Sequence, residues 1–188
     1  MREIALHLLD IAENSVAADA RTITLAITED LKSDRLELAV QDDGKGMDPE
    51  LVARLGDPFV TSRTTRQVGL GIPFLKAAAE ACNGGLRITS AAGQGTRLEA
   101  DFQRSHIDRM PLGDLAGTLL TLIVAHPHVR WIVTYRADGA AFVFDSEPIC
   151  QVLGEVPLTE PGVLGFVRKM LEQGVAEVQC AADRKSQG

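Results

Sequence analysis

Residues 35–49 read RLELAVQDDGKGMDP, a strand pattern that ends abruptly in a loop with two glycines and a proline. Polar and apolar residues alternate from Arg35 to Asp42, which predicts a strand with one buried face. The carboxylate of Asp42 can accept a hydrogen bond from an exocyclic amine, and Gly44 and Gly46 let a flat base approach the backbone. The hexapeptide DDGKGM therefore indicates a base-binding loop or, nearly as well, an ordinary turn after a strand.

Upstream, a helix is predicted from Arg2 to Ala18, because apolar residues recur there with helical spacing. At about 100° per residue, four polar residues fall on one line along this helix: Glu3, His7, Asp10 and Asn14. The amide oxygen of Asn14 can ligate Mg²⁺, and Asp10 can orient or deprotonate a nucleophile. A polar line of this kind is more often the solvated side of a surface helix. His7 is expected to hydrogen-bond locally rather than to carry a phosphoryl group.

Strands and helices continue on both sides of the loop. Thr22–Thr28 is predicted to pair with the strand at 35–42, and a short helix is predicted at Pro49–Leu55. Residues 56–68 have no periodicity, which is typical of a functional lid or a disordered segment. The next helix opens at Gly69-Leu70-Gly71-Ile72, where free backbone N–H groups can hold an anion. A second hairpin follows at 86–102.

The last part of the chain has a pattern of its own after a polar connector at Gln103–Pro111. In order, we expect a helix, two strands, a proline-marked loop and a helix, at Leu112–Ala125, Val129–Arg136, Ala140–Asp145 and about Pro161–Gln173. This predicts a small C-terminal α-β-β-α unit of about 80 residues at 104–188, appended to a domain at 1–103. Its apolar strands suit an interaction or dimerisation surface.

Composition narrows the class of protein. The chain has 26 acidic and 19 basic residues, a net charge of −7, which argues against a protein that coats nucleic acid. Its three cysteines form no CxxC motif and fit a reducing cytosol. No uninterrupted apolar run reaches the roughly 18 residues of a spanning helix. We therefore expect a cytoplasmic protein that binds neither nucleic acid nor a membrane.

Five segments resemble, in sequence order, the boxes of the ATP-binding superfamily shared by histidine kinases, gyrase B, the mismatch-repair ATPases and related chaperones. They are ENS (13–15), DDGKGM (42–47), DPF (57–59), GLGIPFLKAAAEACNGG (69–85) and GQGTRLEADF (93–102). The resemblance covers about residues 3–102. It implies an α/β fold, a two-layer α/β sandwich with a mixed sheet, in which ATP lies between helices and sheet under a mobile lid.

The resemblance implies a role for each matching position. Asn14 matches the Mg²⁺ ligand, Asp42 the carboxylate that binds adenine, and Thr96 the threonine near the phosphates and adenine. The remaining matches surround the nucleotide: Gly44, Gly46 and Met47 beside the base, Phe59 in the F box, and Gly69, Leu70 and Gly71 on the phosphate side. Arg63 and Arg66 lie in the lid, where they either reach a γ-phosphate or remain exposed loop charges.

Asp10 lies at a position where the relatives differ. Four residues before the asparagine, histidine kinases commonly have an amide, whereas the hydrolysing and serine- or pyruvate-dehydrogenase-kinase branches have a glutamate proposed as general base. Aspartate is acidic but one methylene shorter, which implies action through an additional water or slow turnover. The printed sequence begins at this helix, so we expect a free-standing domain without phosphoacceptor helices.

The sequence thus predicts an ATP- and Mg²⁺-binding protein in signalling, acting as a protein kinase or slow ATPase with Asp10 as the catalytic residue. The alternative is a nucleotide-gated protein-binding module with little turnover, and a serine kinase of the anti-sigma type is a third hypothesis. The expected partners are ATP or ADP and a protein that binds the C-terminal unit, with a homodimer as a further option.

Overall fold

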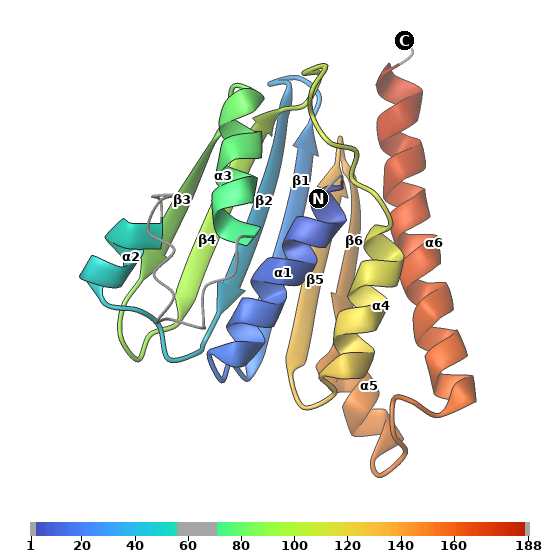
Figure 1. Cartoon of the computed structure of the whole chain (residues 1–188). Helices are drawn as coiled ribbons and strands as arrows, with labels where there is room; N and C mark the ends of the chain where they lie inside the picture. Colours follow the sequence, from blue (N-terminus) through green and yellow to red (C-terminus); the bar gives the residue numbers. More distant parts are fainter. Residues whose placement is uncertain (1–2, 56–70, 187–188) are drawn as a thin grey trace.

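The structure, a computed structural model, describes residues 3–55 and 71–186 (Figure 1). Six helices and a sheet of six strands are formed by these residues. In chain order the elements are α1 (Ile4–Ala17), β1 (Thr22–Asp30), β2 (Arg35–Asp42), α2 (Pro49–Leu55), α3 (Gly71–Ala81), β3 (Gly85–Ser90), β4 (Thr96–Gln103), α4 (Leu115–Ala125), β5 (Arg130–Ala137), β6 (Ala140–Asp145), α5 (Ser146–Leu153) and α6 (Pro161–Ser186).

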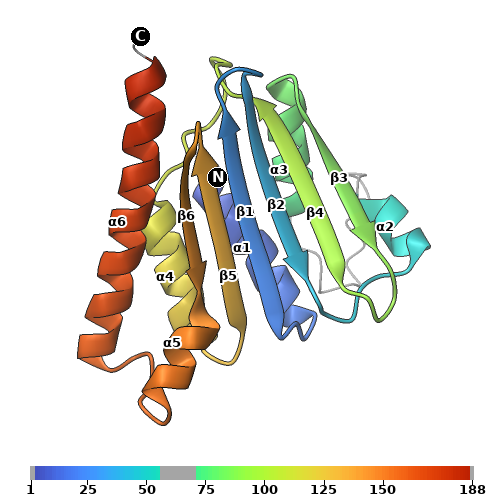
Figure 2. The same ribbon diagram turned by 180° about the vertical axis from the view of Figure 1, so that it is seen from behind.

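The sheet is mixed, with the strand order β3-β4-β2-β1-β5-β6 (Figure 2). β1 and β5 run parallel to each other, and every other neighbouring pair in the sheet is antiparallel. A parallel pair needs a long crossover between its strands, whereas antiparallel neighbours need only a hairpin. The predicted α/β fold with a mixed sheet is therefore confirmed.

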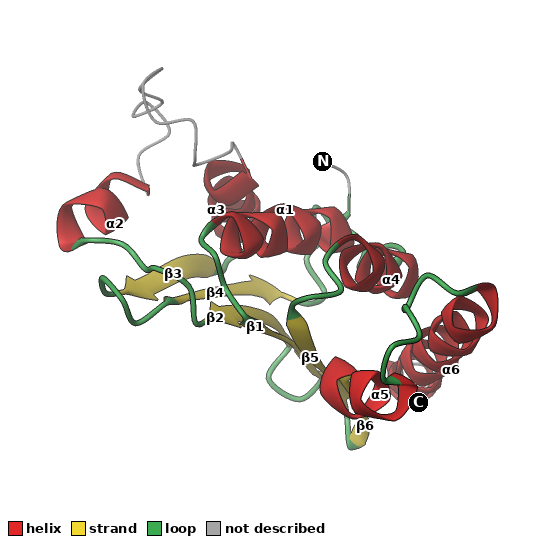
Figure 3. Ribbon diagram, turned by 90° about the horizontal axis from the view of Figure 1, so that it is seen from below, coloured by secondary structure: helices red, strands yellow, loops and turns green. Residues whose placement is uncertain are grey.

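Period-two alternation places the apolar side chains of the strands on one face of the sheet. Leu25 of β1, for example, lies opposite Val40 of β2 and Val133 of β5, and all three are buried. Figure 3 shows α1, α3 and α4 lying side by side on one face of the sheet. The apolar side of α1, including Ile4 and Leu8, is buried in the same core. Helices and sheet thus form the two layers that the resemblance implied.

The C-terminal elements extend the same sheet. β5 pairs with β1 from Thr22 opposite Arg130 to Glu29 opposite Ala137, so the buried rows run without interruption into β5. The expected helix, two strands and final helix are present with an additional helix, α5, before the last one, and α6 packs along β6 and against α4. The boundary after residue 103 stays a prediction, since strands from both sides of it share one sheet and one core.

The structure differs from the expected elements in this part at α4, α5 and α6, and β5 is shifted by one residue. α4 begins at Leu115 rather than Leu112, because Gly113 has a φ of +77° and the carboxylate of Asp114 caps the helix by accepting from the Gly117 amide at 2.8 Å. The loop expected after β6 instead contains α5, which Asp145 caps in the same way.

The last helix, α6, continues well beyond the residue 173 expected from the sequence. Gly174, an apparent stop signal, is an interior position where the helix approaches the ring of Phe142 on β6. Although α6 spans 26 residues, neither it nor another helix in the described part of the chain is long and apolar enough to cross a membrane.

Candidate functional site

A cavity opens between α1 and the end of β2, with a volume of about 770 Å³ including the space continuous with solvent. Small-molecule sites are commonly concave and mostly apolar, with a few polar groups that fix the ligand. Among the predicted site residues, the cavity is lined by Asn14, Asp42, Gly46, Met47 and Thr96. Its apolar walls include Ile11, Val40, Leu55, Ile72, Ile88 and Leu98. The fold therefore brings together residues that lie more than 80 positions apart in the sequence.

Asp42 is a buried polar side chain of the cavity, with 8% of its surface exposed. It is the last residue of β2, where the register places it opposite Thr96 of β4. Its Oδ1 accepts hydrogen bonds from the amides of Gly44 (3.0 Å) and Thr96 (3.1 Å), and its Oδ2 accepts one from the Ser15 hydroxyl (2.7 Å). A carboxylate has about four lone-pair sites. Among the described residues, three donors therefore use this carboxylate and one acceptor position remains, on Oδ2.

The neighbouring Asp43 has a structural role. Its Oδ1 accepts from the amides of Arg21 (2.7 Å) and Thr22 (2.9 Å) and so holds the start of β1. Burial raises the pKa of Asp43, but these hydrogen bonds outweigh that effect and lower the pKa below its ordinary value. The two adjacent acids of the loop therefore serve different purposes.

The glycines of the loop allow two chain segments to meet. A side chain at Gly44 would lie 2.7 Å from the Ala18 carbonyl oxygen at the end of α1. Gly46 has a φ of +64°, and a Cβ there would overlap the Ala91 carbonyl of the second hairpin. The amide of Gly93 in that hairpin donates to the Lys45 carbonyl at 2.7 Å. These glycines therefore close the site by backbone packing, in addition to any role in admitting a base.

Two residues of the site were missed from the sequence. Ser15 follows Asn14 on α1 and bonds Asp42, and Ser90, the last residue of β3, accepts from the Met47 amide at 2.9 Å. Both are isolated serines whose partners lie 27 and 43 residues away. Ser15 lies within the ENS segment, but only the packing of α1 against the end of β2 brings it to Asp42, and only the approach of the loop after β2 to the hairpin brings Met47 to Ser90.

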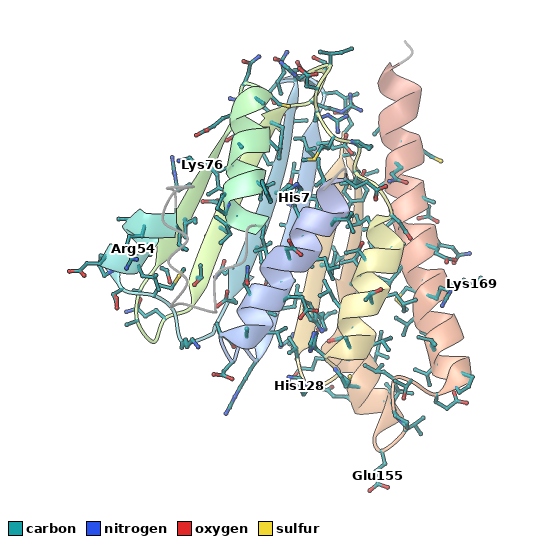
Figure 4. The ribbon with its side chains drawn as sticks, viewed as in Figure 1. His7, Arg54, Lys76, His128, Glu155 and Lys169 are labelled. Atoms are coloured by element: carbon teal, nitrogen blue, oxygen red, sulfur yellow. The ribbon has the colours of Figure 1, made fainter. Side chains whose placement is uncertain are left out.

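The polar line on α1 is not a solvated surface. His7 is 2% exposed, and Asp10 and Asn14 are partly buried. Figure 4 labels His7 in the first half of α1, on the side toward α3. The ring makes a hydrogen bond to the backbone of Gly71, while its Nδ1 has no partner among the described residues. Burial lowers the pKa of His7 from its ordinary value, and Asp10 and the Gly71 hydrogen bond oppose that shift.

Asp10 lies against the first residue of α3. A Cβ added at Gly71 would be 2.9 Å from Asp10 Oδ2, so a larger residue there would push this carboxylate aside. Asp10 does not itself line the cavity, whereas Asn14, one turn further along α1, does. The carboxylate is therefore held at the N-terminus of α3, next to the cavity.

Asn14 offers a neutral amide oxygen as a ligand for a hard cation at this site. Within the described residues, no hydrogen bond occupies its side-chain amide, and it lines the cavity. Mg²⁺ requires oxygen ligands and often takes only one or two from the protein, with the others from water and phosphate. The described residues contain no group of three His, Cys, Asp or Glu side chains that could hold a metal alone. The donor set fits Mg²⁺ only together with a phosphate ligand.

Five predicted site residues lie outside the described residues: Phe59, Arg63, Arg66, Gly69 and Leu70. Gly71 is described, and it contacts Asp10 as stated above. The predicted lid falls in the same undescribed range.

A family model described as histidine kinase-, DNA gyrase B-, and HSP90-like ATPase matches residues 1–106. The sensor protein kinase FleS of Pseudomonas aeruginosa is 42% identical over 88 residues, which are 47% of this chain and 22% of FleS. A putative sensor histidine kinase NtrY-like protein of Rickettsia conorii is 27% identical over 108 residues, 57% of this chain and 18% of that protein. This chain thus spans about a fifth of the length of these curated relatives.

A solved structure described as the N-terminal domain of a DNA repair protein shares the fold. It superposes with a TM-score of 0.52 at 12% identity, over 77% of this chain and 52% of that one. At this identity, the similarity concerns the arrangement of helices and strands. Its coverage is greater than the 106 residues of the family match, so the common arrangement continues into the C-terminal elements.

Proposed function

The chain belongs to the histidine kinase-, DNA gyrase B- and HSP90-like ATPase family, and on that premise we propose that it binds Mg²⁺-ATP in the cavity beside Asp42 and acts as a protein kinase or slow ATPase. The observation that carries this proposal is the burial and hydrogen bonding of the Asp42 carboxylate. A buried carboxylate that is fixed by hydrogen bonds and keeps one acceptor position in an apolar cavity is suited to a single donor on a flat ligand.

The adenine base accounts for both the polar and the apolar lining. Its exocyclic amine is a donor that matches the remaining acceptor position on Asp42 Oδ2. Ile72, Ile88 and Leu98 offer apolar surface for its faces. The fixed geometry of Asp42 means that little side-chain entropy is lost on binding.

The phosphates would extend toward α1 and the start of α3. Asn14 supplies an oxygen ligand for Mg²⁺, which when bound neutralises charge on the phosphates. The amides at the N-terminus of α3 favour an anion, so Gly71 is assigned to the phosphate side. The roles of Phe59, Arg63, Arg66, Gly69 and Leu70 rest on the family resemblance alone.

Asp10 is the proposed catalytic residue. Its carboxylate is held next to Gly71 at the phosphate side and can orient or deprotonate an attacking hydroxyl or water. The sensor kinases among the relatives favour phosphotransfer, and the acidic side chain at this position is equally suited to slow hydrolysis. Phosphotransfer and hydrolysis would use the same site. They differ in whether a protein hydroxyl or a water accepts the phosphoryl group.

A nucleotide-gated binding module is the second candidate, and one contact favours it. Glu13, next to Asn14 on α1, has its Oε1 3.0 Å from Nε2 of His126 at the end of α4. A change at Asn14 on nucleotide binding would thereby reach the C-terminal elements, the proposed surface for a protein partner. A cytoplasmic location and a homodimer belong to the same proposal.

The deciding experiment uses γ-labelled ATP with Mg²⁺ and follows both free phosphate and protein-bound label. We expect one of the two signals from the wild-type chain and neither from Asn14→Ala. Gln151→Ala, which removes an exposed amide on α5, is the matched control and should behave as wild type. ATP binding by calorimetry with neither signal selects the binding module, and absence of ATP binding contradicts the proposal as a whole.

A further inference from the structure

The hydroxyl of Ser90 sits at a junction of three hydrogen bonds. It accepts from the amide of Met47 (2.9 Å), donates to the carbonyl of Gly95 (2.8 Å) and lies 2.9 Å from the hydroxyl of Thr96. Through these contacts one side chain joins the loop after β2 to both strands of the β3–β4 hairpin. Thr96 lines the cavity, whereas Ser90 is not part of its lining among the described residues.

Counting protons fixes the direction of the Ser90–Thr96 hydrogen bond. A serine hydroxyl has one proton, and a backbone carbonyl can only accept. The proton of Ser90 therefore goes to Gly95, and Thr96 must donate to Ser90. In the opposite arrangement, the 2.8 Å contact with Gly95 would join two acceptors and would be repulsive. The only hydroxyl proton of Thr96 is therefore used in a hydrogen bond within the protein.

The direction of this hydrogen bond decides which groups of the cavity can donate to a ligand and which can only accept. With its proton committed, the Thr96 hydroxyl retains only acceptor capacity. The remaining position on Asp42 is also an acceptor. The amide of Thr96, which is a donor, is already bonded to Asp42 Oδ1. The side chains of Asp42 and Thr96 therefore accept hydrogen bonds at this end of the cavity and donate none to a ligand.

We propose that Ser90 is a positioning residue that orients the Thr96 hydroxyl and thereby makes the site discriminate a 6-amino purine from a 6-oxo purine. This inference rests on the proposed function, because it concerns the base of the nucleotide assigned to the same cavity. A 6-amino group donates to the oxygens of Asp42 and Thr96, whereas a 6-oxo group places a third acceptor against these two. A site built for one hydrogen-bond pattern rejects the other because buried polar groups would be left unpaired.

The test compares Mg²⁺-ATP with Mg²⁺-ITP, which has a 6-oxo base, by calorimetry on the full chain. In Ser90→Ala the Thr96 hydroxyl is released, can rotate, and can donate to a 6-oxo group. We expect the ratio of the two dissociation constants to fall by about tenfold, the size of one hydrogen bond gained or lost. Ser90→Thr keeps the hydroxyl and should retain the wild-type ratio. Thr89→Ala, at an exposed position on the same strand, is the control.

If Ser90 had only a structural role, Ser90→Ala would weaken the binding of both nucleotides equally and leave the ratio of their dissociation constants unchanged. That result overturns the inference. Thr96→Val provides a second test that is independent of how Ser90→Ala folds. It removes the hydroxyl and keeps the amide, so we expect the same loss of discrimination, and an unchanged ratio again contradicts the inference. If the wild-type chain binds neither nucleotide, the proposed function fails as well, whereas ATP binding with unchanged ratios removes only the role of Ser90.

Discussion

Ser15 Oγ donates a 2.7 Å hydrogen bond to Asp42 Oδ2 and so joins α1 to the end of β2 inside the cavity. Both side chains are buried, and their positions differ by 27 residues in the sequence. The bond aligns Asp42 from the helix layer, while the amides of Gly44 and Thr96 align it from the sheet layer. The Asp42 carboxylate is thus held from both layers of the fold.

Replacing Asp42 should abolish most nucleotide affinity. In Asp42→Asn one acceptor becomes a donor, which meets the donating amine of adenine or the Ser15 hydroxyl. We expect ATP affinity, measured by calorimetry, to fall by about 10- to 100-fold, the range of a hydrogen bond to a charged group. Asp108→Asn removes the same charge from an exposed position in the connector and should change little. An unchanged affinity in Asp42→Asn would exclude this carboxylate from the binding site.

Enlarging Gly71 should impair turnover without affecting Asp42. A methyl group in Gly71→Ala lies 2.9 Å from Asp10 Oδ2 and displaces that carboxylate. Because small misplacements of a catalytic group are costly, we expect turnover of γ-labelled ATP to fall by about 10- to 100-fold. Gly85→Ala, whose nearest neighbour would be Asp101 Oδ1 at 3.9 Å, is the control. Equal turnover in the two variants would argue against Asp10 as the catalytic residue.

The buried ring of His7 should make stability depend on pH. Burial lowers its pKa in the folded state below the ordinary value of 6.5, so the unfolded chain binds more protons in the range between the two values. The free energy of unfolding should therefore decrease as the pH falls below about 6.5 and level off below the lowered pKa. Urea unfolding at several pH values measures this slope.

A pair of histidine variants isolates the contribution of His7. His7→Gln keeps a donor for the backbone of Gly71 but does not titrate, so the slope below pH 6.5 should become shallower. His128→Gln, at an exposed position labelled in Figure 4, should leave the slope in place. Identical slopes in His7→Gln and the wild type would show that His7 does not contribute to it.

Two glycines of α6 should respond in opposite ways to a methyl group. In Gly174→Ala the new Cβ overlaps the Phe142 ring and separates α6 from β6, so we expect a loss of about 1–3 kcal/mol in the free energy of unfolding. In Gly165→Ala nothing lies within 4 Å of the new Cβ, and the change should be neutral or stabilise by about 0.5–1 kcal/mol. Thermal unfolding measures both. A neutral Gly174→Ala would mean that α6 is not held by this contact.

Much of the strand pattern was predictable from local periodicity. β2 and β6 match their expected bounds, and so does α2, because alternation, turn glycines and a proline at the first helical position are all local signals. α5 was missed since its residues include a proline and follow a strand directly, and its cap, Asp145, also served as the last residue of β6. The end of α6 was missed because glycine is a stop signal only where no packing partner requires it.

The amino-acid sequence by itself determined the family, because five short motifs occur in the family's order, and that resemblance implied the positions of Asn14, Asp42 and Thr96 and the two-layer α/β class. Tertiary structure alone decided which segments meet: β5 beside β1, Ser15 on Asp42, and Ser90 on Thr96. The physical reason is that strand partners are selected by packing of whole apolar faces, which no local pattern records. The proton held between two hydroxyls is likewise a property of their distance, and it exists only once the hairpin has closed.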